Sequence, residues 1–409
     1  MLYQAFQAQA DLAWPLQVLA RASKGVLDQL EDLSAAGGGT VEPKRRLAAA
    51  YEVFSRARLT HKRPNFGIDH VRVGSDDVKV IEEVAYDAPF GALLRFRKEA
   101  APAQPRVLIV APMSGHFATL LRETVRTMLT DHEVYITDWR NARDVSLLNG
   151  RFGMDEYIAH LIAFLGAMGP GAHVVAVCQP CVATLAAAAV MAEGGHEAEP
   201  RSITLMAGPI DCRINPTRVN ELATGRPMSW FESNLISSVP WRFGGALRRV
   251  YPGFLQLSAF MSMNLERHQK AFVDLYNHLV AGETEKAEAT ANFYEEYFAV
   301  ADLPAEFYLE TVRLVFQEYA LARGELRWRG ARVDTAAIRR PALMTIEGQR
   351  DDICSVGQTV AAQDLCAGIR PYRKQHHVQT GVGHYGVFSG RRWTEEIYPL
   401  VRDMIHIAN

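Results

Sequence analysis

The sequence predicts an α/β protein with a doubly wound, mostly parallel sheet and a helical cap inserted before its last two strands. Two observations support this fold class. Short apolar runs rich in valine and isoleucine alternate with helical segments, which is typical of buried parallel strands. A long stretch without strand pattern, residues 214–331, interrupts the alternation before it resumes near residue 341.

Residues 1–60 have the pattern of an N-terminal helical segment. Leucines recur near helical spacing from Leu12 to Leu27, and the glycines at 37–39 break the pattern. We expect a helix packed on the body of the protein. A helix that docks on a partner or a surface is the alternative.

The strands of the sheet are expected in chain order, beginning with an antiparallel hairpin. The hairpin and the parallel strands after it are placed at 78–86, 91–98, 107–112, 133–139, 173–178, 202–208, 341–348 and 374–381. Helices are placed between them at about 116–129, 155–165 and 182–193. Residues 61–213 and 332–409 therefore form the predicted α/β core, and 214–331 form the cap.

Composition excludes several classes of function. The 44 basic residues do not outnumber the 46 acidic ones, so no nucleic-acid partner is expected. The N-terminus lacks the basic and apolar regions of a signal peptide, and no run of 18 apolar residues predicts a membrane span. Five cysteines, an odd count, argue against a disulfide framework, so we expect a cytoplasmic protein.

A strand runs directly into an alanine-rich helix in the segment HVVAVCQPCVATLAAAAVMA, residues 173–192. Such a turn predicts a nucleophile elbow, with Cys181 as the nucleophile at the positive end of the helix. Val182 would offer its backbone N–H to an oxyanion. Ala183 supplies the small residue on one side of the turn, whereas Gln179 stands where glycine is usual on the other.

Three alternative roles for these cysteines stay open. Cys178 and Cys181 have the spacing of a redox pair, but the chain is far longer than a thioredoxin-like domain. A zinc site would need a second pair with ligand spacing, which the sequence lacks. Both cysteines could instead be buried and structural, which is the role we expect for Cys178.

The C-terminal segments supply an acid and a base. PALMTIEGQRDDIC places Asp351 in the loop after an apolar strand, with Asp352 as its rival, and TGVGHYGVFSG places His384 among glycines. The order of nucleophile, acid and base, each in a loop after a strand, is that of an α/β-hydrolase. We therefore predict a triad of Cys181, Asp351 and His384.

The second oxyanion donor is expected in VLIVAPMSGHFATLL, residues 107–121. The backbone N–H of Met113 or Ser114 fits this role, and the sequence does not separate the two. Ser114 lacks the elbow context of a nucleophile, and His116 is expected only to cap or pack. The predicted chemistry is attack of a thiolate on an ester carbonyl, a thioester intermediate, and hydrolysis.

At these residues the chain resembles the intracellular poly(3-hydroxybutyrate) depolymerases over about residues 1–405. The resemblance is carried by VCQPCVA, APMSGHFATLLR, TDWRNAR, MAGPIDCRINPTRVN, GQRDDIC and GVGHYG. It implies cleavage of 3-hydroxyalkanoate polyester in cytoplasmic granules and gives the triad roles to Cys181, Asp351 and His384. Polyhydroxyalkanoate synthases share the cysteine, but Gln179 and Asp352 depart from their pattern.

A granule presents a hydrophobic surface, so the resemblance implies exposed apolar groups. The candidates lie in the aromatic cap, where the alternative is a place in its own core: Trp230, Phe231, Trp241 and Phe243. The expected partners are the granule surface and hydroxyalkanoate oligomers, a homo-oligomer is left open, and no metal or organic cofactor is expected. An acyltransferase and a non-catalytic granule-coat protein are the competing functions.

Overall fold

A nine-stranded sheet organises the computed structural model, which describes residues 3, 6–7, 42–56, 59–99, 102–263 and 265–409. The strand order is β1-β2-β3-β5-β4-β6-β7-β13-β14. Pairs up to β3–β5 are antiparallel and all later pairs are parallel. The strands are β1 (His70–Val73), β2 (Asp76–Ala88), β3 (Gly91–Lys98), β4 (Arg106–Val110), β5 (Glu133–Trp139), β6 (His173–Val177), β7 (Ser202–Met206), β13 (Ala342–Gly348) and β14 (Lys374–Gln379).

The central strands are buried on both faces, which explains their unbroken apolar sequence. Along β6, Val174 and Ala176 contribute to one hydrophobic core, and Val175 and Val177 contribute to the other. Side chains of a strand alternate between the two faces of a sheet, so a strand covered on both sides needs no polar positions. The predicted fold class, a mostly parallel doubly wound sheet, is confirmed.

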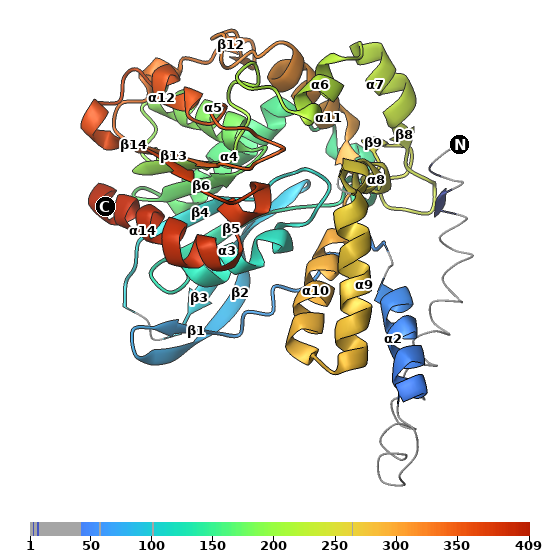
Figure 1. The fold of residues 1–409 in the computed structure, drawn as a ribbon. Helices are drawn as coiled ribbons and strands as arrows, with labels where there is room; N and C mark the ends of the chain where they lie inside the picture. Colours follow the sequence, from blue (N-terminus) through green and yellow to red (C-terminus); the bar gives the residue numbers. More distant parts are fainter. Residues whose placement is uncertain (1–2, 4–5, 8–41, 57–58, 100–101, 264) are drawn as a thin grey trace.

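Helices cover the two faces of this sheet (Figure 1). Residues of α4 and α5 belong to one core, and residues of α3 and α14 belong to the other. The helices outside the insertion are α3 (Arg122–Met128), α4 (Met154–Met168), α5 (Cys181–Glu193), α12 (Ala361–Leu365), α13 (Gly390–Arg392) and α14 (Tyr398–Ala408). Short 3-10 turns cover Ala118–Leu121, Ala142–Asp144, Leu147–Asn149, Thr335–Ala337, Pro371–Arg373 and His384–Val387, and π-helical turns cover Val312–Gln317 and Trp393–Ile397.

The region between β7 and β13 is mainly helical, but it also contains short strands that the sequence did not predict. Its helices are α6 (Arg218–Thr224), α7 (Met228–Leu235), α8 (Gly253–Met263), α9 (Leu265–Ala281), α10 (Thr284–Tyr297) and α11 (Ala305–Thr311). Its strands are β8 (Ser237–Ser238), β9 (Arg249–Tyr251), β10 (Leu303–Pro304), β11 (Arg327–Trp328) and β12 (Ala331–Arg332). Strands of two or three residues are too short to show an alternating pattern. The division of the chain at residues 214 and 331 stays a prediction.

Helices α9 and α10 pack against each other and against α2 (Glu42–Arg56), beside the sheet (Figure 1). Within the predicted N-terminal helical segment, the structure describes α2; the leucines from Leu12 to Leu27 and the glycine run lie outside the described residues. Among the residues that are described, no helix has both the length and the apolar composition needed to cross a membrane.

A buried carboxyl group, Asp302, lies where the α9–α10 pair rejoins the body of the protein. Its Oδ1 accepts a hydrogen bond from the Gly253 N–H at 2.9 Å, and its Oδ2 accepts one from the Tyr3 hydroxyl. Nδ1 of His61 lies 3.9 Å from Oδ1, and Arg143 contributes a favourable charge. Burial is the largest effect and raises the pKa of Asp302 to about 6.

We expect this carboxyl group to make the protein less stable as pH rises. Its pKa in the folded state lies above the ordinary value of 3.8, so its contribution to stability is complete below about pH 4 and is lost as pH rises through about 6. The shift corresponds to about 3 kcal/mol. Denaturant unfolding between pH 4 and 8 should show this loss in the wild type and not in Asp302→Asn. Asp403→Asn, an exposed control, should behave as the wild type; equal slopes in all three proteins would contradict the assignment.

Candidate active site

The turn between β6 and α5 has Cys178 at its apex. Cys178 directly follows the last residue of β6 and has a φ of 68°, in the left-handed region that few residues other than glycine adopt. Its N–H donates to the Met206 carbonyl at 2.8 Å, and its carbonyl accepts from the Cys181 N–H at 3.1 Å. A nucleophile elbow requires such a strained strand-to-helix turn, which projects the side chain above the sheet.

Cys181 is buried and does not lie at the apex. Its side chain is 0% exposed, and Sγ lies 3.4 Å from the Ala176 carbonyl oxygen and 3.8 Å from that of Met206. A Cβ on Gly208 would fall only 2.3 Å from this sulfur. Burial raises the pKa of the Cys181 thiol well above its usual value, which opposes formation of a thiolate. The prediction that the Cys181 sulfur contacts the imidazole is therefore wrong.

Two residues of the predicted triad, His384 and Asp351, are in direct contact. Nδ1 of His384 lies 2.7 Å from Oδ2 of Asp351, and both residues are buried. The other carboxylate oxygen, Oδ1, accepts from the N–H groups of Ile353 at 2.9 Å and Cys354 at 2.8 Å. These bonds fix the carboxylate in the loop after β13, whereas the predicted rival, Asp352, is exposed.

The imidazole of His384 reaches Cys178. Burial lowers the pKa of His384, but the charges of Asp351 and Cys178, together with a hydrogen bond to each side chain, outweigh burial and hold that pKa well above its usual value. Since Nδ1 faces Asp351, Nε2 is the ring nitrogen left for the sulfur. The structure thus brings together Cys178, His384 and Asp351, with Cys178 half-buried.

The loop after β4 places one predicted oxyanion donor beside the elbow. The Met113 N–H donates to Oε1 of Gln179 at 3.3 Å, so it faces the turn that carries Cys178. The structure shows no corresponding contact for the Ser114 N–H. Val182 lies in the first turn of α5, beyond Cys181, and its predicted role depended on that residue. With Cys178 at the apex, the residue that follows it is Gln179.

Sequence reasoning missed a buried carboxylate that supports the Asp351 loop. Glu347 is 0% exposed at the end of β13 and accepts from the N–H groups of Gly357 at 3.0 Å, Thr359 at 2.7 Å and Val360 at 3.0 Å. The Thr359 hydroxyl in turn donates to the Gly208 carbonyl at 3.0 Å. An acidic residue inside an apolar strand was the signal, because buried carboxylates need such partners.

The aromatic residues proposed for surface contact differ in exposure. Trp241 is 86% exposed and Trp230 is 37% exposed. Phe231 is buried at 6% exposure, with its ring 5.3 Å from that of Trp230, so its predicted surface role is wrong. Phe243 is half-buried, with the Arg143 guanidinium 4.4 Å from the centre of its ring. The sequence alone does not show whether an apolar residue of a helical insertion lies in the core of that insertion or on its surface.

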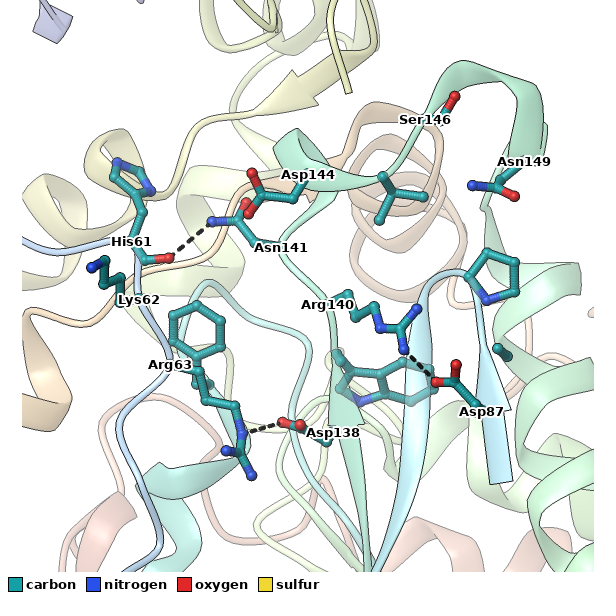
Figure 2. Close-up of a pocket in the computed structure, with 15 residues that line it drawn as sticks. His61, Lys62, Arg63, Asp87, Asp138, Arg140, Asn141, Asp144, Ser146 and Asn149 are labelled. Carbon is teal, nitrogen blue, oxygen red and sulfur yellow. Dashed lines mark hydrogen bonds and ion pairs between the residues drawn. The ribbon is translucent and has the colours of Figure 1, made fainter. Parts of the chain in front are cut away.

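A polar cavity of about 780 Å³ lies beside the end of β5 (Figure 2). Its charged side chains largely pair with one another: Arg63 donates to Asp138 at 2.9 Å, and Arg140 forms an ion pair with Asp87. The Asn141 side chain points at the His61 carbonyl, 3.5 Å away. The contacts of Arg63 and His61 tie residues 61–63 to the end of β5, and the Arg140–Asp87 pair joins that end to β2, so the pairs have a structural role.

One family model matches the C-terminal part of the chain. Residues 207–409 match the family model described as "PHB de-polymerase C-terminus". No curated protein matches the chain.

Solved structures align with most of the chain at low identity. A carboxylesterase structure from Nitrososphaera gargenis is 16% identical, covers 83% of this chain and 98% of its own, and has a TM-score of 0.41. The 2-hydroxy-6-oxo-6-phenylhexa-2,4-dienoate hydrolase from Rhodococcus sp. strain RHA1 is 13% identical. It covers 80% of this chain and 99% of its own, with a TM-score of 0.44. Likenesses at this level carry no information about the reaction.

Proposed function

We propose that the protein hydrolyses poly(3-hydroxyalkanoate) esters with Cys178 as the nucleophile. Residues 207–409 match the family model described as "PHB de-polymerase C-terminus", which supports the substrate class. The family and the fold support an ester hydrolase. The observation that carries the finer proposal is the contact of His384 with both Cys178 and Asp351, at a strained elbow. This assignment replaces Cys181 in the predicted triad.

The mechanism follows from these positions. His384 takes the thiol proton of Cys178, and the sulfur attacks the ester carbonyl, while Asp351 fixes the imidazole tautomer. The N–H groups of Gln179 and Met113 stabilise the oxyanion, each contributing about 3 kcal/mol, after the substrate displaces the Gln179 side chain from the Met113 N–H. The alcohol leaves with a proton from His384, and a thioester remains. Water, deprotonated by His384, then releases the hydroxy acid.

Amorphous granules of poly(3-hydroxybutyrate) provide the direct test of this function. The purified protein should release 3-hydroxybutyrate and short oligomers from them, with no cofactor added. Adding coenzyme A should not change the products that are released. A coenzyme A thioester as the main product would identify an acyltransferase instead, and cleavage of a soluble butyrate ester without attack on the polymer would indicate another ester substrate.

We also propose that four exposed side chains, here called the loop patch, adsorb to the granule and place the protein there in the cytoplasm. Leu148 is 97%, Trp241 86%, Leu247 70% and Leu147 49% exposed. Their two loops are joined, because the Gly245 N–H donates to the Arg143 carbonyl at 2.7 Å. Leu247 has a φ of 67°, a costly conformation for a residue whose side chain stays in solvent. Exposed apolar groups gathered on one surface are typical of interaction sites.

Changing Leu148 and Trp241 to serine should lower granule binding at least about tenfold, since each buried apolar side chain contributes about 1.5–3 kcal/mol. Hydrolysis of a soluble ester should be unchanged. Sedimentation with granules measures the first quantity and an esterase assay the second. Leu222→Ser changes an equally apolar residue that is 66% exposed on α6, and should bind as the wild type does. Unaltered binding of the double variant would eliminate the loop patch as the contact surface.

A further inference from the structure

A cavity of about 850 Å³ lies between the α9–α10 pair and the loops that follow β13 and β14. His384 forms part of its wall, together with the glycine-rich loop that carries it. Helix α10 lines the opposite side with three aromatic residues: Phe293, Tyr294 and Tyr297. Among the described residues, the wall also contains Arg350, the residue before Asp351.

Arg350 carries a positive charge that the described residues leave uncompensated. Within the ranges that the structure describes, no acidic side chain forms an ion pair with it, and its side chain is exposed to the cavity. Asp352, the carboxylate in the same wall, has a partner of its own. The Arg350 backbone is fixed, because its N–H donates to the Val382 carbonyl at 2.9 Å, two residues before His384.

We propose that Arg350 binds the free carboxylate of the departing hydroxy acid, so that the enzyme cleaves polyester from its carboxyl end. The inference rests on the proposed ester hydrolysis and specifies which ester bond is cut. When the ester C–O bond breaks and the C–S bond forms, the imidazolium of His384 gives its proton to the leaving oxygen. The leaving oxygen must therefore lie beside His384, and the cavity that His384 helps to line offers space for the rest of the leaving group.

The chemistry of the leaving group matches this cavity. In a 3-hydroxy acid, two carbon atoms separate the leaving oxygen from the carboxyl group, so the two groups lie close together, as do the sequence positions of Arg350 and Asp351, the partner of His384. A guanidinium binds a carboxylate through two parallel charge-assisted hydrogen bonds. At an interior bond of the polymer the same position holds an uncharged ester, which cannot form this pair. Arg350 would thus distinguish the chain end from the interior.

The dimer of 3-hydroxybutyrate and its methyl ester differ only in this carboxylate and provide the test. The wild type should hydrolyse the free acid at least about tenfold more efficiently, through KM, because the methyl ester lacks the charge-assisted pair with Arg350. Arg350→Gln should remove this preference and leave the methyl ester unaffected, and Arg350→Lys should retain part of it. The control Arg402→Gln, which changes a half-buried arginine on α14, should behave as the wild type.

Calorimetry on the Cys178→Ala background separates this inference from the proposed function. The acid dimer should bind at least about tenfold more tightly than its methyl ester, and Arg350→Gln should abolish the difference. Equal affinities, or equal losses for both dimers on substitution, would overturn the carboxylate site. Selective binding of the acid together with no turnover by the wild type would instead reject the hydrolase proposal and leave the site standing.

Discussion

Replacing Cys178 by alanine is expected to lower kcat/KM for ester hydrolysis by about 10⁴-fold or more, equivalent to about 5.5 kcal/mol of transition-state stabilisation. The change removes the sulfur that lies against His384 at the strained elbow. What remains is the catalysis that the oxyanion donors and substrate binding supply without a nucleophile. Assays on a soluble ester should measure the loss, so that adsorption to granules plays no part.

Cys181→Ala is the matched control, because it removes a sulfur of the same turn. The Cys181 side chain is buried against the carbonyls of Ala176 and Met206, so its loss should lower stability by about 1–2 kcal/mol and activity less than about tenfold. A thiol-reactive ester probe should label the wild type and Cys181→Ala, and fail on Cys178→Ala. The opposite pattern of labelling would restore Cys181 as the nucleophile.

Asp351→Asn should lower kcat by about 10³–10⁴-fold while changing KM little. One carboxylate oxygen is already held by the N–H groups of Ile353 and Cys354, so the amide nitrogen would face His384. The imidazole would then have to accept at Nδ1 and carry its proton on Nε2, the nitrogen that faces Cys178. In this tautomer it cannot take the thiol proton.

The pH dependence gives a second measure of the same change. Asp351 is the strongest of the groups that raise the pKa of His384, so its loss should move the ionisation of the imidazole to lower pH. Histidine NMR signals followed from pH 5 to 9 would record the shift. Asp352→Asn alters the neighbouring exposed carboxylate and should leave both kcat and the titration unchanged. Equal losses in the two variants would show that the acid was assigned to the wrong loop position.

The fold could be predicted because its core strands are buried on both faces. Segments such as VLIVAP and HVVAVC are continuously apolar, and they became β4 and β6. Short strands of the cap such as β8 and β11 have two residues each, so they show no alternation of apolar and polar residues and could not be predicted. The carboxyl ends of parallel strands share one edge, which is why loops far apart in the chain could be predicted to meet there.

The contact between Asp351 and His384 could be expected from the sequence because each residue follows a strand, and the structure places their side chains 2.7 Å apart. The choice between Cys178 and Cys181 depended on the φ angle of Cys178 at the end of β6. This angle cannot be predicted from the run of apolar residues that forms the strand. Counting the turn as four residues placed the apex three positions late, inside the first turn of α5. Phe231 was misplaced for a similar reason, because burial on a cap helix depends on its neighbours.

Beneath the elbow, the Cys181 sulfur fills a gap whose opposite side is the bare Cα of Gly208. The Cys181 sulfur therefore acts here by filling space and not by reacting. A bulkier side chain at Cys181 or Gly208 would push β7 away from the turn and change the orientation of Cys178 relative to the imidazole. The buried Cys181 thiol thus helps to orient the Cys178 thiol, the proposed nucleophile.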